Sequence, residues 1–564
     1  MQQQRPSAFL HWRSGIAILV VCMTLLPVLS FVRFATTHAA AFSLAWKELV
    51  PVLSRSLIFT MLQALASTAL ALVIGMPGAW LAAKYRFPFR NALLALAAVP
   101  FCMPPMLVVL AFVLYFGRQG WFTTLLSLVM GGDRSYRGSL YSFGGLVMVH
   151  AFYNFPIVVQ QVGALWARIP QGAKEAARTL GAKRWQAFLT GTLPWLAPGM
   201  FQAAGLIFLY CFFSFTTVLV FGGTSGSTLE VEIFRSLRYA GRPMQALVFA
   251  ILETGGALSA IAIISRLGAH GDKAVKDFGR RPPLAQPRGF VIGILLLYAA
   301  GLAFFFFGPL LAVAVEAFRV PSSLGGRMQF GPGNFIRLIR GFQAPLLPAL
   351  AMTLRVSGSA AVAATVLGVA AALAVRQGPG TGTDLQEHGL LHRMPVSAVR
   401  FLMWLPLAVS PAVFAYGWAF LSSHLAGNES TGGMQLALAA AQAMMAWPFV
   451  ARGVSAALAS IDRSTREAAR TLGARPMQAF LTVELRAIAP SVAASAAFAF
   501  SITAGDVNVP LMLGMGEFET LPLLLYRLTS AYRFNEACAA GLVLAVLTGF
   551  VFFLKEKYLD VSLG

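Results

Sequence analysis

Twelve apolar stretches recur along this 564-residue chain, and each is long enough to form a membrane-spanning helix. A helix of about 20 apolar residues crosses the hydrocarbon core of a bilayer. Charged residues make up 11% of the chain, whereas soluble proteins have about 25%. The composition therefore excludes a soluble enzyme and a disordered chain. The predicted spans are 15–32, 57–83, 92–117, 143–165, 187–221, 244–265, 289–318, 348–375, 401–423, 434–458, 488–513 and 536–554.

The distribution of positive charge predicts how the chain crosses the membrane. If the N-terminus is cytoplasmic, the segments on the cytoplasmic side contain 26 Lys and Arg, and the outer segments contain 15. Cytoplasmic loops of membrane proteins carry such an excess. We therefore expect both termini to be cytoplasmic. The net charge of +22 follows from this topology, and we expect no nucleic-acid partner because no long hydrophilic domain carries the charge.

Several chemical signatures are missing from the sequence. No G-x-x-x-x-G-K-[ST] phosphate loop occurs, so this chain is not expected to hydrolyse ATP itself. The four cysteines lie in apolar runs without C-x-x-C spacing, which indicates neither a disulfide framework nor a zinc site. His388 and His392 have i, i+4 spacing but belong to a predicted cytoplasmic loop without an H-E-x-x-H pattern. We therefore expect no metal site, no catalytic residue and no cofactor in this chain.

An internal repeat divides the chain into two related halves. Residues 175–190 read EAARTLGAKRWQAFLT and residues 467–482 read EAARTLGARPMQAFLT, so 13 of 16 positions are identical at an offset of 292 residues. The same offset pairs Pro156 with Pro448. A register held without a gap indicates duplicated architecture. We predict a first half at 1–265, a polar cytoplasmic linker at 266–288 and a second half at 289–564.

Each copy of the repeat predicts a short helix, a tight turn and a second short segment on the cytoplasmic side. Gly181 and Gly473 follow the helical pattern, and glycine suits the left-handed conformation that ends many helices. Leu180 belongs to a small apolar face that precedes the first of these turns. A projecting helix of this kind can dock into a groove of a partner protein.

The pattern Glu-Ala-Ala, then Gly six residues after the Glu, then Leu-Pro, resembles the EAA loop of ABC importer permeases. In that family the loop contacts the ATP-hydrolysing subunit, so the resemblance implies that the segments 170–194 and 462–486 couple this chain to an ATPase. Two departures are Gly191, where an Ile-like residue is expected, and Arg486, which replaces a Pro. The positions that match are Glu175, Ala176, Ala177, Gly181, Leu193 and Pro194, and then Glu467, Ala468, Ala469, Gly473 and Leu485.

Two such loops on one chain resemble a fused permease, in which one polypeptide supplies both halves of the pore. The resemblance implies an all-α polytopic fold of the type I ABC importer permeases, with about twelve transmembrane helices in two tandem six-helix halves. It also implies two copies of a cytoplasmic ATPase that holds ATP and Mg, an extracytoplasmic binding protein, and a place in a bacterial inner membrane.

Further stretches are similar to those of bacterial thiamine permeases, and they favour thiamine or its phosphates as the substrate. Fused Fe(III) permeases share the same plan, so Fe(III) is the alternative. These stretches are GRQGW at 117–121, HAFYNFP at 150–156, LIFLYCFFSFTTVLVFGG at 206–223, VELRA at 483–487 and FETLPLLLYRLTSAYR at 518–533.

Ionisable residues inside predicted spans are candidates for the substrate pathway, because a charge in the membrane interior is costly. Only Glu253 and Asp506 are acids well inside the spans, and Ser214 is the duplicate of Asp506. A cationic substrate favours a carboxylate and aromatic faces. For Asp506, a structural hydrogen bond between helices is an equal alternative. The candidate pathway residues are Tyr210, Phe213, Ser214, Glu253, Tyr416, Trp447, Asp506 and Asn508.

On the predicted outer face, the repeat pairs segment 228–239 with segment 520–531. We predict that these segments, with Arg235 and Arg527, help to receive a binding protein, and an ordinary amphipathic hairpin is the alternative. A different class of protein, a secondary transporter, predicts charges spread through several spans and no repeated docking loop. The sequence has the repeated loop and few buried charges, so it favours an ATP-driven importer.

Overall fold

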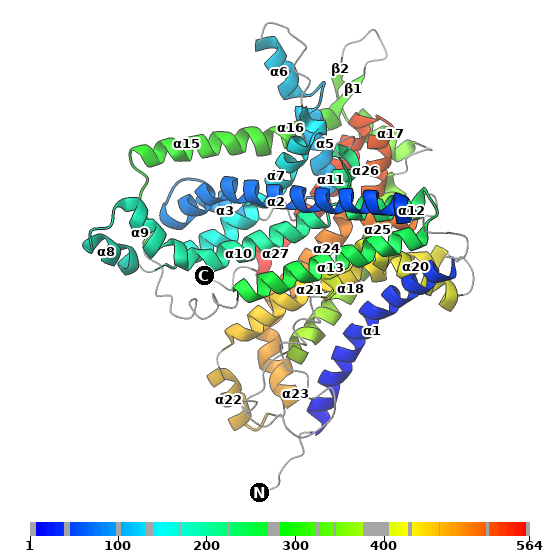
Figure 1. Cartoon of the computed structure of the whole chain (residues 1–564). Helices are drawn as coiled ribbons and strands as arrows, with labels where there is room; N and C mark the ends of the chain where they lie inside the picture. The colour runs from blue at the N-terminus through cyan, green and yellow to red at the C-terminus, as the bar shows by residue number, and fades with distance from the viewer. Residues whose placement is uncertain are drawn as a thin grey trace. The chain divides into compact units, whose positions relative to one another are not determined.

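A computed structural model shows an almost entirely helical chain with a single two-stranded hairpin among its described residues (Figure 1). The model describes residues 7–38, 46–96, 103–129, 139–169, 171–222, 226–268, 283–321, 328–341, 346–375, 405–426, 431–461, 463–474, 476–514 and 518–559. His388 and His392 lie outside these residues.

Ten helices in the described part of the chain are long and apolar enough to cross a membrane, and they correspond to ten of the predicted spans. The other two predicted spans fall on α1 (Ser7–Thr37) and α20 (Pro411–Ala426). Residues 401–404 of the second lie outside the description. The polytopic helical fold is therefore confirmed, and the count of twelve stays a prediction. The ten helices cover 47–84, 105–129, 143–166, 193–212, 243–264, 290–318, 346–373, 432–460, 482–505 and 534–551.

The chain forms two compact units. One consists of residues 43–338 and 525–542, and the other of residues 1–42, 339–524 and 543–564. We call them the 43–338 unit and the 339–524 unit. They differ from the two sequence halves because the first helical stretch of each half packs with helices of the other half. The division at 1–265, 266–288 and 289–564 describes the repeat, and as a statement about domains it stays a prediction.

In the 43–338 unit, α2 and α7 pack along each other, and α10 packs against both. The π-helical turn η3 and α16, which come from the second half of the sequence, complete the unit by packing with α5 and with α15. Its principal elements are α2 (Trp46–Lys84), α3 (Arg90–Leu96), α5 (Pro105–Phe116), α6 (Trp121–Val129), α7 (Phe143–Trp166), α8 (Gln171–Thr179), α9 (Arg184–Gly191), α10 (Leu193–Phe212), α11 (Thr216–Phe221), α12 (Leu229–Arg238), α13 (Pro243–Gly268), α15 (Phe290–Leu302), η3 (Ala303–Phe307), α16 (Gly308–Phe318), β1 (Arg319–Pro321), β2 (Met328–Phe330) and most of α17 (Gly333–Arg340).

In the 339–524 unit, α18, α21 and α24 pack on one another as α2, α7 and α10 do in the other unit. Helix α1 packs on α18 and α20. Its elements besides α1 and α20 are α18 (Leu346–Val375), α21 (Thr431–Ser460), α22 (Arg463–Thr471), α23 (Pro476–Ala479), η4 (Phe480–Glu484), α24 (Leu485–Gly505) and α25 (Asn508–Leu513), with the first part of α26 (Leu521–Ser530) and the second part of α27 (Phe534–Leu559).

The duplicated packing depends on glycines that allow two helices to approach closely. A Cβ added to Gly75 on α2 would lie 2.5 Å from Cβ of Val158 on α7. In the other unit, a Cβ added to Gly368 on α18 would lie 2.6 Å from Cβ of Val450 on α21. Small residues are typical of helix contacts in membranes, where van der Waals packing stabilises association. A similar close contact between two long helices therefore occurs in both units.

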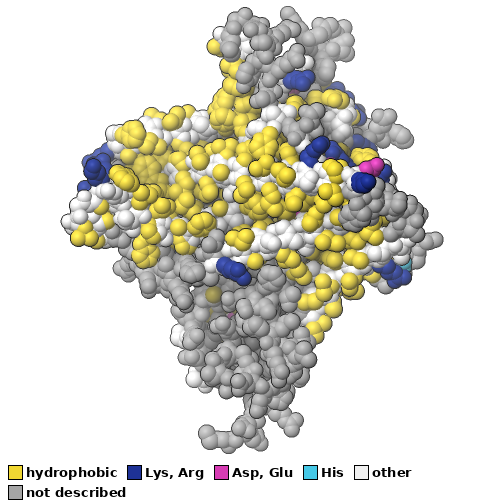
Figure 2. All heavy atoms as spheres, in the orientation of Figure 1, with side chains coloured by type: hydrophobic (Ala, Val, Ile, Leu, Met, Phe, Trp, Pro, Cys, Tyr) yellow, Lys and Arg dark blue, Asp and Glu magenta, His cyan; other side chains and the backbone are white. Residues whose placement is uncertain are grey.

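Hydrophobic side chains dominate the described surface in Figure 2, and few charged side chains interrupt them. The long helix α2, for example, has Ile58, Leu62, Leu65 and Val73 exposed. Such residues would lie against lipid, where apolar exposure carries no penalty. The surface therefore agrees with a chain that crosses the membrane several times.

Candidate coupling loops and pathway residues

The first predicted coupling loop is a helix, a glycine turn and a second helix. Helix α8 ends in a turn in which Gly181 has a φ of +87°. The backbone N–H of Leu180 donates to the carbonyl of Ala176 over 3.2 Å, and that of Ala182 donates to the carbonyl of Ala177 over 3.1 Å. These bonds satisfy the last carbonyls of the helix. Helix α9 then begins with the N–H of Lys183 bonded to Gln186 at 2.8 Å.

The second loop repeats the glycine turn and the two backbone hydrogen bonds at the helix end. Gly473 has a φ of +82°, the N–H of Leu472 donates to Ala468 over 3.1 Å, and the N–H of Ala474 donates to Ala469 over 3.1 Å. The predicted glycine turn is therefore present in both copies. The side chain of Glu467 lies outside the described part of the structure.

A leucine side chain projects into solvent at the tip of each loop. Leu180 is 88% exposed and Leu472 is 87% exposed. Glu175 and Ala176, which precede the first tip, are also exposed. The two loops therefore present the same exposed apolar side chain at the same position of the turn. The geometry supports the predicted coupling role without testing it.

The two loops differ where they join the next membrane helix. In the first copy, α9 ends at Gly191 and α10 begins at Leu193 with Pro194 in its first turn. Proline is favoured there because the first turn of a helix needs no N–H donor. In the second copy, Arg486 takes the proline position, and α23, η4 and α24 form an uninterrupted helical run that includes a π-helical turn. The copy that has Arg486 in place of the proline therefore joins its loop to the next membrane helix without a break.

The predicted spans 187–221 and 488–513 are both interrupted. After the end of α9, the first consists of α10 and α11, which are separated by residues 213–215, and the second consists of α24 and α25, which are separated by Asp506 and Val507. The prediction of one continuous helix in each of these two spans is therefore wrong. Discontinuous helices in transporters often accompany substrate sites, and Ser214 and Asp506 lie at the two breaks.

Each break is joined to the neighbouring long helix by a polar contact. In the 43–338 unit, His150 Nε2 on α7 lies 2.7 Å from Ser214 Oγ. In the 339–524 unit, Gln442 Nε2 on α21 donates to Asp506 Oδ2 over 3.3 Å. The offset of 292 pairs His150 with Gln442 as well as Ser214 with Asp506. The sequence analysis identified Ser214 and Asp506 but missed His150 and Gln442, which the same offset could have revealed.

The Asp506 carboxylate is also bonded to the backbone that follows it. The N–H of Asn508 donates to Oδ1 over 3.0 Å, and the N–H of Val509 donates to Oδ2 over 3.3 Å. The carboxylate therefore caps the start of α25 in addition to accepting the Gln442 amide. Asp506 and Asn508 are the two predicted pathway residues that the structure brings together.

Glu253 lies in a different place from the other candidates. Its side chain on α13 is fully buried, and it faces Glu230 at the start of α12, which is also fully buried. Neither carboxyl oxygen of Glu253 has a hydrogen-bond partner that meets ordinary distance and angle limits in the described part of the chain. Sequence reasoning missed Glu230 because it assigned segment 222–243 to an outer connection.

The predicted aromatic candidates differ in exposure. Tyr210, Phe213 and Tyr416 are half-buried, whereas Trp447 is 1% exposed. Phe213 lies edge-on to Phe212, with the ring centroids 5.4 Å apart. The assignment of the four rings to the pathway stays a prediction.

The predicted outer segments form helices rather than a hairpin. The N–H of Leu229, at the start of α12, donates to Thr60 Oγ1 over 3.1 Å, and the N–H of Leu521, at the start of α26, donates to Thr353 Oγ1 over 2.8 Å. Arg235 is half-exposed and pairs with Glu232 at 3.0 Å. Arg527, in α26, is exposed.

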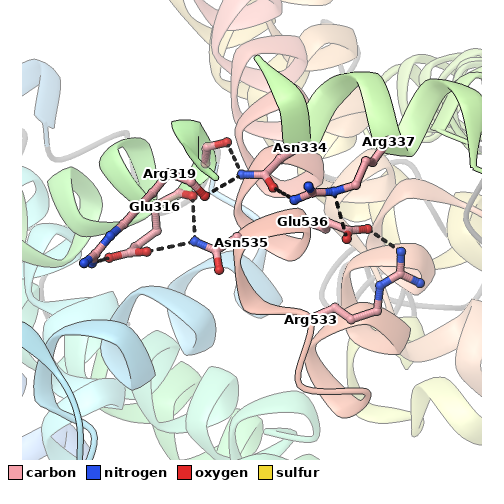
Figure 3. Close-up of polar contacts among 8 residues, drawn as sticks. Glu316, Arg319, Asn334, Arg337, Arg533, Asn535 and Glu536 are labelled. Atoms are coloured by element: carbon pink, nitrogen blue, oxygen red, sulfur yellow. Dashed lines mark hydrogen bonds and ion pairs between the residues drawn. The ribbon is translucent and has the colours of Figure 1, made fainter. Parts of the chain in front are cut away.

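A polar network that sequence reasoning missed surrounds Glu316 at the end of α16 (Figure 3). Glu316 is 8% exposed. Its carboxylate accepts from Trp121 Nε1 at 3.1 Å, from Arg319 at 2.9 Å and from Asn535 Nδ2 at 2.9 Å. These partners come from α6, β1 and α27, so one carboxylate holds three elements together.

The same network continues to Glu536 on α27 (Figure 3). Glu536 pairs with Arg533 and lies 3.5 Å from Arg337 Nε, and Arg337 in turn bonds to Asn334. Asn334 donates to the carbonyls of Ala317 and Arg319 at 2.8 and 3.0 Å. The whole network belongs to the 43–338 unit and its 525–542 segment.

The described residues contain no group of three or more His, Cys, Asp or Glu side chains that could hold a metal ion. The described residues therefore give no candidate cluster of metal ligands.

Comparison with known proteins identifies a family model and relatives that cover most of the chain. The family model described as "binding-protein-dependent transport system inner membrane component" matches residues 71–271 and 388–562. The thiamine transport system permease protein ThiP of Escherichia coli strain K12 is 28% identical over 514 residues, covering 88% of each chain. ThiP of Salmonella typhimurium is 27% identical over 554 residues, covering 96% of this chain and 95% of that one.

Two further similarities cover less of the chain. The molybdenum transport system permease protein ModB of Azotobacter vinelandii is 35% identical over 177 residues, which are 30% of this chain and 74% of that one. A solved structure of a bacterial ABC transporter involved in the import of the acidic polysaccharide alginate matches with a TM-score of 0.37 and 18% identity. That match covers 48% of this chain and 94% of the other.

Proposed function

This chain belongs to the family of binding-protein-dependent transport system inner membrane components, and from that membership we propose that it is the permease subunit of an ABC importer for thiamine or its phosphates. Two relatives that match over most of their length are thiamine permeases, which favours thiamine over Fe(III). The observation that carries the coupling part of the proposal is the duplicated glycine turn with an exposed leucine at each tip.

In this proposal, a separate ATPase binds ATP and Mg and docks on the two coupling loops, one copy to each loop. Leu180 and Leu472 enter apolar grooves on the ATPase, because an exposed leucine loses its unfavourable hydration when a partner covers it. Both termini of the permease and both loops face the cytoplasm of a bacterial cell, as the excess of Lys and Arg in those segments favours.

On the other side of the membrane, an extracytoplasmic binding protein delivers the substrate. The outer helices α12 and α26, with Arg235 and Arg527, are the proposed docking elements. The pathway residues at the helix breaks, Ser214 and Asp506, then line the route of the substrate. A carboxylate at one break and a hydroxyl at the other make the route asymmetric, which suits a cation that needs a single counter-charge.

The transport part of the proposal is tested by uptake. Cells that lack thiamine uptake receive this chain together with its ATPase and binding protein, and radiolabelled thiamine and Fe(III) are supplied in parallel. We expect thiamine uptake to appear and to stop when ATP is depleted. Iron uptake without thiamine uptake would overturn the substrate, and uptake that survives ATP depletion would overturn the ABC mechanism.

The coupling part is tested by binding of the ATPase to purified permease. We expect Leu180→Ser and Leu472→Ser to weaken this binding, each by about 1 kcal/mol or more, since a buried leucine contributes about 1.5–3 kcal/mol. The matched control is Tyr239→Ser, which removes a 69% exposed apolar side chain on the predicted outer face. ATPase binding that is equal in all three variants would contradict the proposed docking positions.

A further inference from the structure

A pair of carboxyl groups is buried where α12 packs against α13. Glu230, in the first turn of α12, and Glu253, inside α13, are both fully buried. The two carboxyl groups are close enough to share a hydrogen bond, and neither oxygen of Glu253 has another hydrogen-bond partner in the described part of the chain. A buried charge that lacks compensation is unfavourable, so the pair needs a physical explanation.

The internal repeat shows that the helices at this place form without the pair. The offset of 292 residues aligns Glu230 with Pro522 and Glu253 with Ala545. The helices α26 and α27 form at those positions with no carboxyl group at either one. An ionisable residue inside a membrane span is costly, and where the fold does not demand it, a functional role is the better explanation.

The two carboxyl groups differ in how well each one tolerates a negative charge. Glu230 lies in the first turn of α12, where the helix dipole favours an anion. Glu253 lies more than two turns from either end of α13, where this effect does not reach. Since two facing carboxylates repel, the favourable arrangement places the negative charge on Glu230 and a proton on Glu253, whose O–H then donates to Glu230.

The other charged and titratable groups of the surrounding helices lie elsewhere. On α12, Glu232 pairs with the half-exposed Arg235 at 3.0 Å. Helix α10, which packs against α13, has no charged residue, and its Cys211 sulfur accepts a hydrogen bond from Asn154 of α7 at 3.5 Å. The remaining groups of α2, α10, α12 and α13, none of which is buried, are Lys47, Glu48, Arg55, Lys84, Tyr210, Arg238 and Arg266.

The start of α12 is tied to the helix break at Ser214. Thr228, which precedes α12, donates from Oγ1 to the carbonyl of Ser214 over 2.9 Å. The duplicate of Thr228 is Thr520, and its hydroxyl has no hydrogen-bond partner among the residues that the structure describes. A displacement of the start of α12 would therefore reach the break in the first half through this bond.

We propose that Glu230 and Glu253 bind one proton and that this proton holds the start of α12 against α13. Loss of the proton to water leaves two carboxylates facing each other in a fully buried place, and their repulsion drives the start of α12 away from α13. Thr228 moves with it, and the break at Ser214 changes. The effect on transport rests on the proposed function, whereas the binding of the proton does not.

The first experiment detects the proton directly. Infrared spectroscopy of the purified permease records the carbonyl stretch of protonated carboxyl groups, which carboxylates lack. Near neutral pH we expect this band to contain a component that Glu253→Gln removes. Glu48→Gln, at an exposed acid of α2, should leave the band unchanged. A band that is the same in Glu253→Gln as in the wild type would overturn the proposal.

The second experiment measures what the proton contributes to stability. Thermal unfolding of the wild type and of Glu253→Gln is followed from about pH 6 to about pH 9, because buried glutamates in proteins titrate as high as about pH 8–9. A proton that only the folded state holds is lost as the pH rises, and its stabilising effect is lost with it. We expect the unfolding temperature of the wild type to fall more steeply with pH than that of the variant. Parallel curves would contradict the proposal.

Uptake across the same pH range separates the proton switch from the proposed function. Thiamine uptake by the wild type should fall by up to about tenfold per pH unit where one proton is lost, and Glu253→Gln should have a flatter profile. Ser259→Ala, which removes an exposed hydroxyl on α13, should follow the wild-type profile. Identical profiles in all three proteins would overturn the switch. Absence of thiamine uptake from all three, with the expected infrared band and unfolding curves, would overturn the proposed substrate and support the proton site.

Discussion

His150 Nε2 lies 2.7 Å from Ser214 Oγ, and the two residues that the repeat pairs with them, Gln442 and Asp506, also bond to each other. The contact between a long helix and the break in its neighbour has therefore been kept in both halves while its chemistry has changed. One half presents a neutral hydroxyl and an imidazole, and the other presents a carboxylate and an amide. Of the two breaks, the one at Asp506 has an acidic side chain and the one at Ser214 does not.

Asp506→Asn tests whether that carboxylate serves the substrate. Asparagine retains one oxygen for the backbone N–H of Asn508 but loses the charge, so we expect a folded permease with thiamine uptake that needs a higher substrate concentration. Uptake against concentration gives the apparent KM, and thermal unfolding gives the stability. Ser501→Ala, which removes a hydroxyl bonded to Ala497 at 3.0 Å on the same helix, is the control. Unchanged uptake at every concentration would leave Asp506 a purely structural cap.

Glu253→Gln tests the buried carboxyl pair. Two buried carboxylates that face each other repel when both are ionised, and an amide facing Glu230 donates a hydrogen bond at any pH, whereas a carboxyl donates one only while it is protonated. We expect the purified variant to unfold at a higher temperature, with a gain of about 1 kcal/mol in the free energy of unfolding. Uptake measured in parallel shows whether the charge is also needed for transport. A lower unfolding temperature would mean that the Glu253 carboxyl has a partner that glutamine cannot replace.

Gly473→Ala tests the left-handed turn of the second coupling loop. A Cβ at Gly473 meets no atom within 4 Å, so the cost arises from the backbone conformation alone, and this cost is about 1–2 kcal/mol. We expect weaker ATPase binding and slower uptake with little loss of global stability. Gly172→Ala is the matched control, because Gly172 lies inside α8 in equally open space without a positive φ. Equal effects of the two substitutions would show that the turn conformation is not required.

Glu316→Ala tests the network around the end of α16. The substitution leaves the partners Trp121, Arg319 and Asn535 without their common acceptor, and an orphaned buried polar group costs about 1–3 kcal/mol. We expect the unfolding temperature to fall by several degrees. Glu48→Ala, at an exposed acid in the first turn of α2, should have a smaller effect. If the two variants unfold at the same temperature, the network does not stabilise the 43–338 unit.

Ten of the membrane spans were predictable because each span is a local property of about 20 residues. The glycine turns were predictable for the same reason, since the sequence around Gly181 and Gly473 specifies a helix end without help from the rest of the fold. Because the two loops are copies in the repeat, the sequence of the first loop also predicts the structure of the second. All of these features depend on residues close together in the chain.

The features that could not be predicted depend on contacts between residues that are far apart in the chain. Glu316 and Asn535 are 219 residues apart, and no local pattern connects them. The packing of α1 on α18 and α20 is invisible to hydropathy, because an apolar helix has no preferred partner in a lipid environment. Glu230 lies in a polar stretch of sequence that hydropathy assigns to an outer connection between two spans. Its burial depends on α13, which follows it in the chain.

The run from α23 to α24 joins the second coupling loop to its membrane helix without a break, whereas Thr192 interrupts the helix between α9 and α10. The second run contains the π-helical turn η4, and such turns are common sites of bending in helices. A displacement of either loop would therefore reach its membrane helix through a deformable segment, which is a residue between two helices in the first half and a π-helical turn in the second.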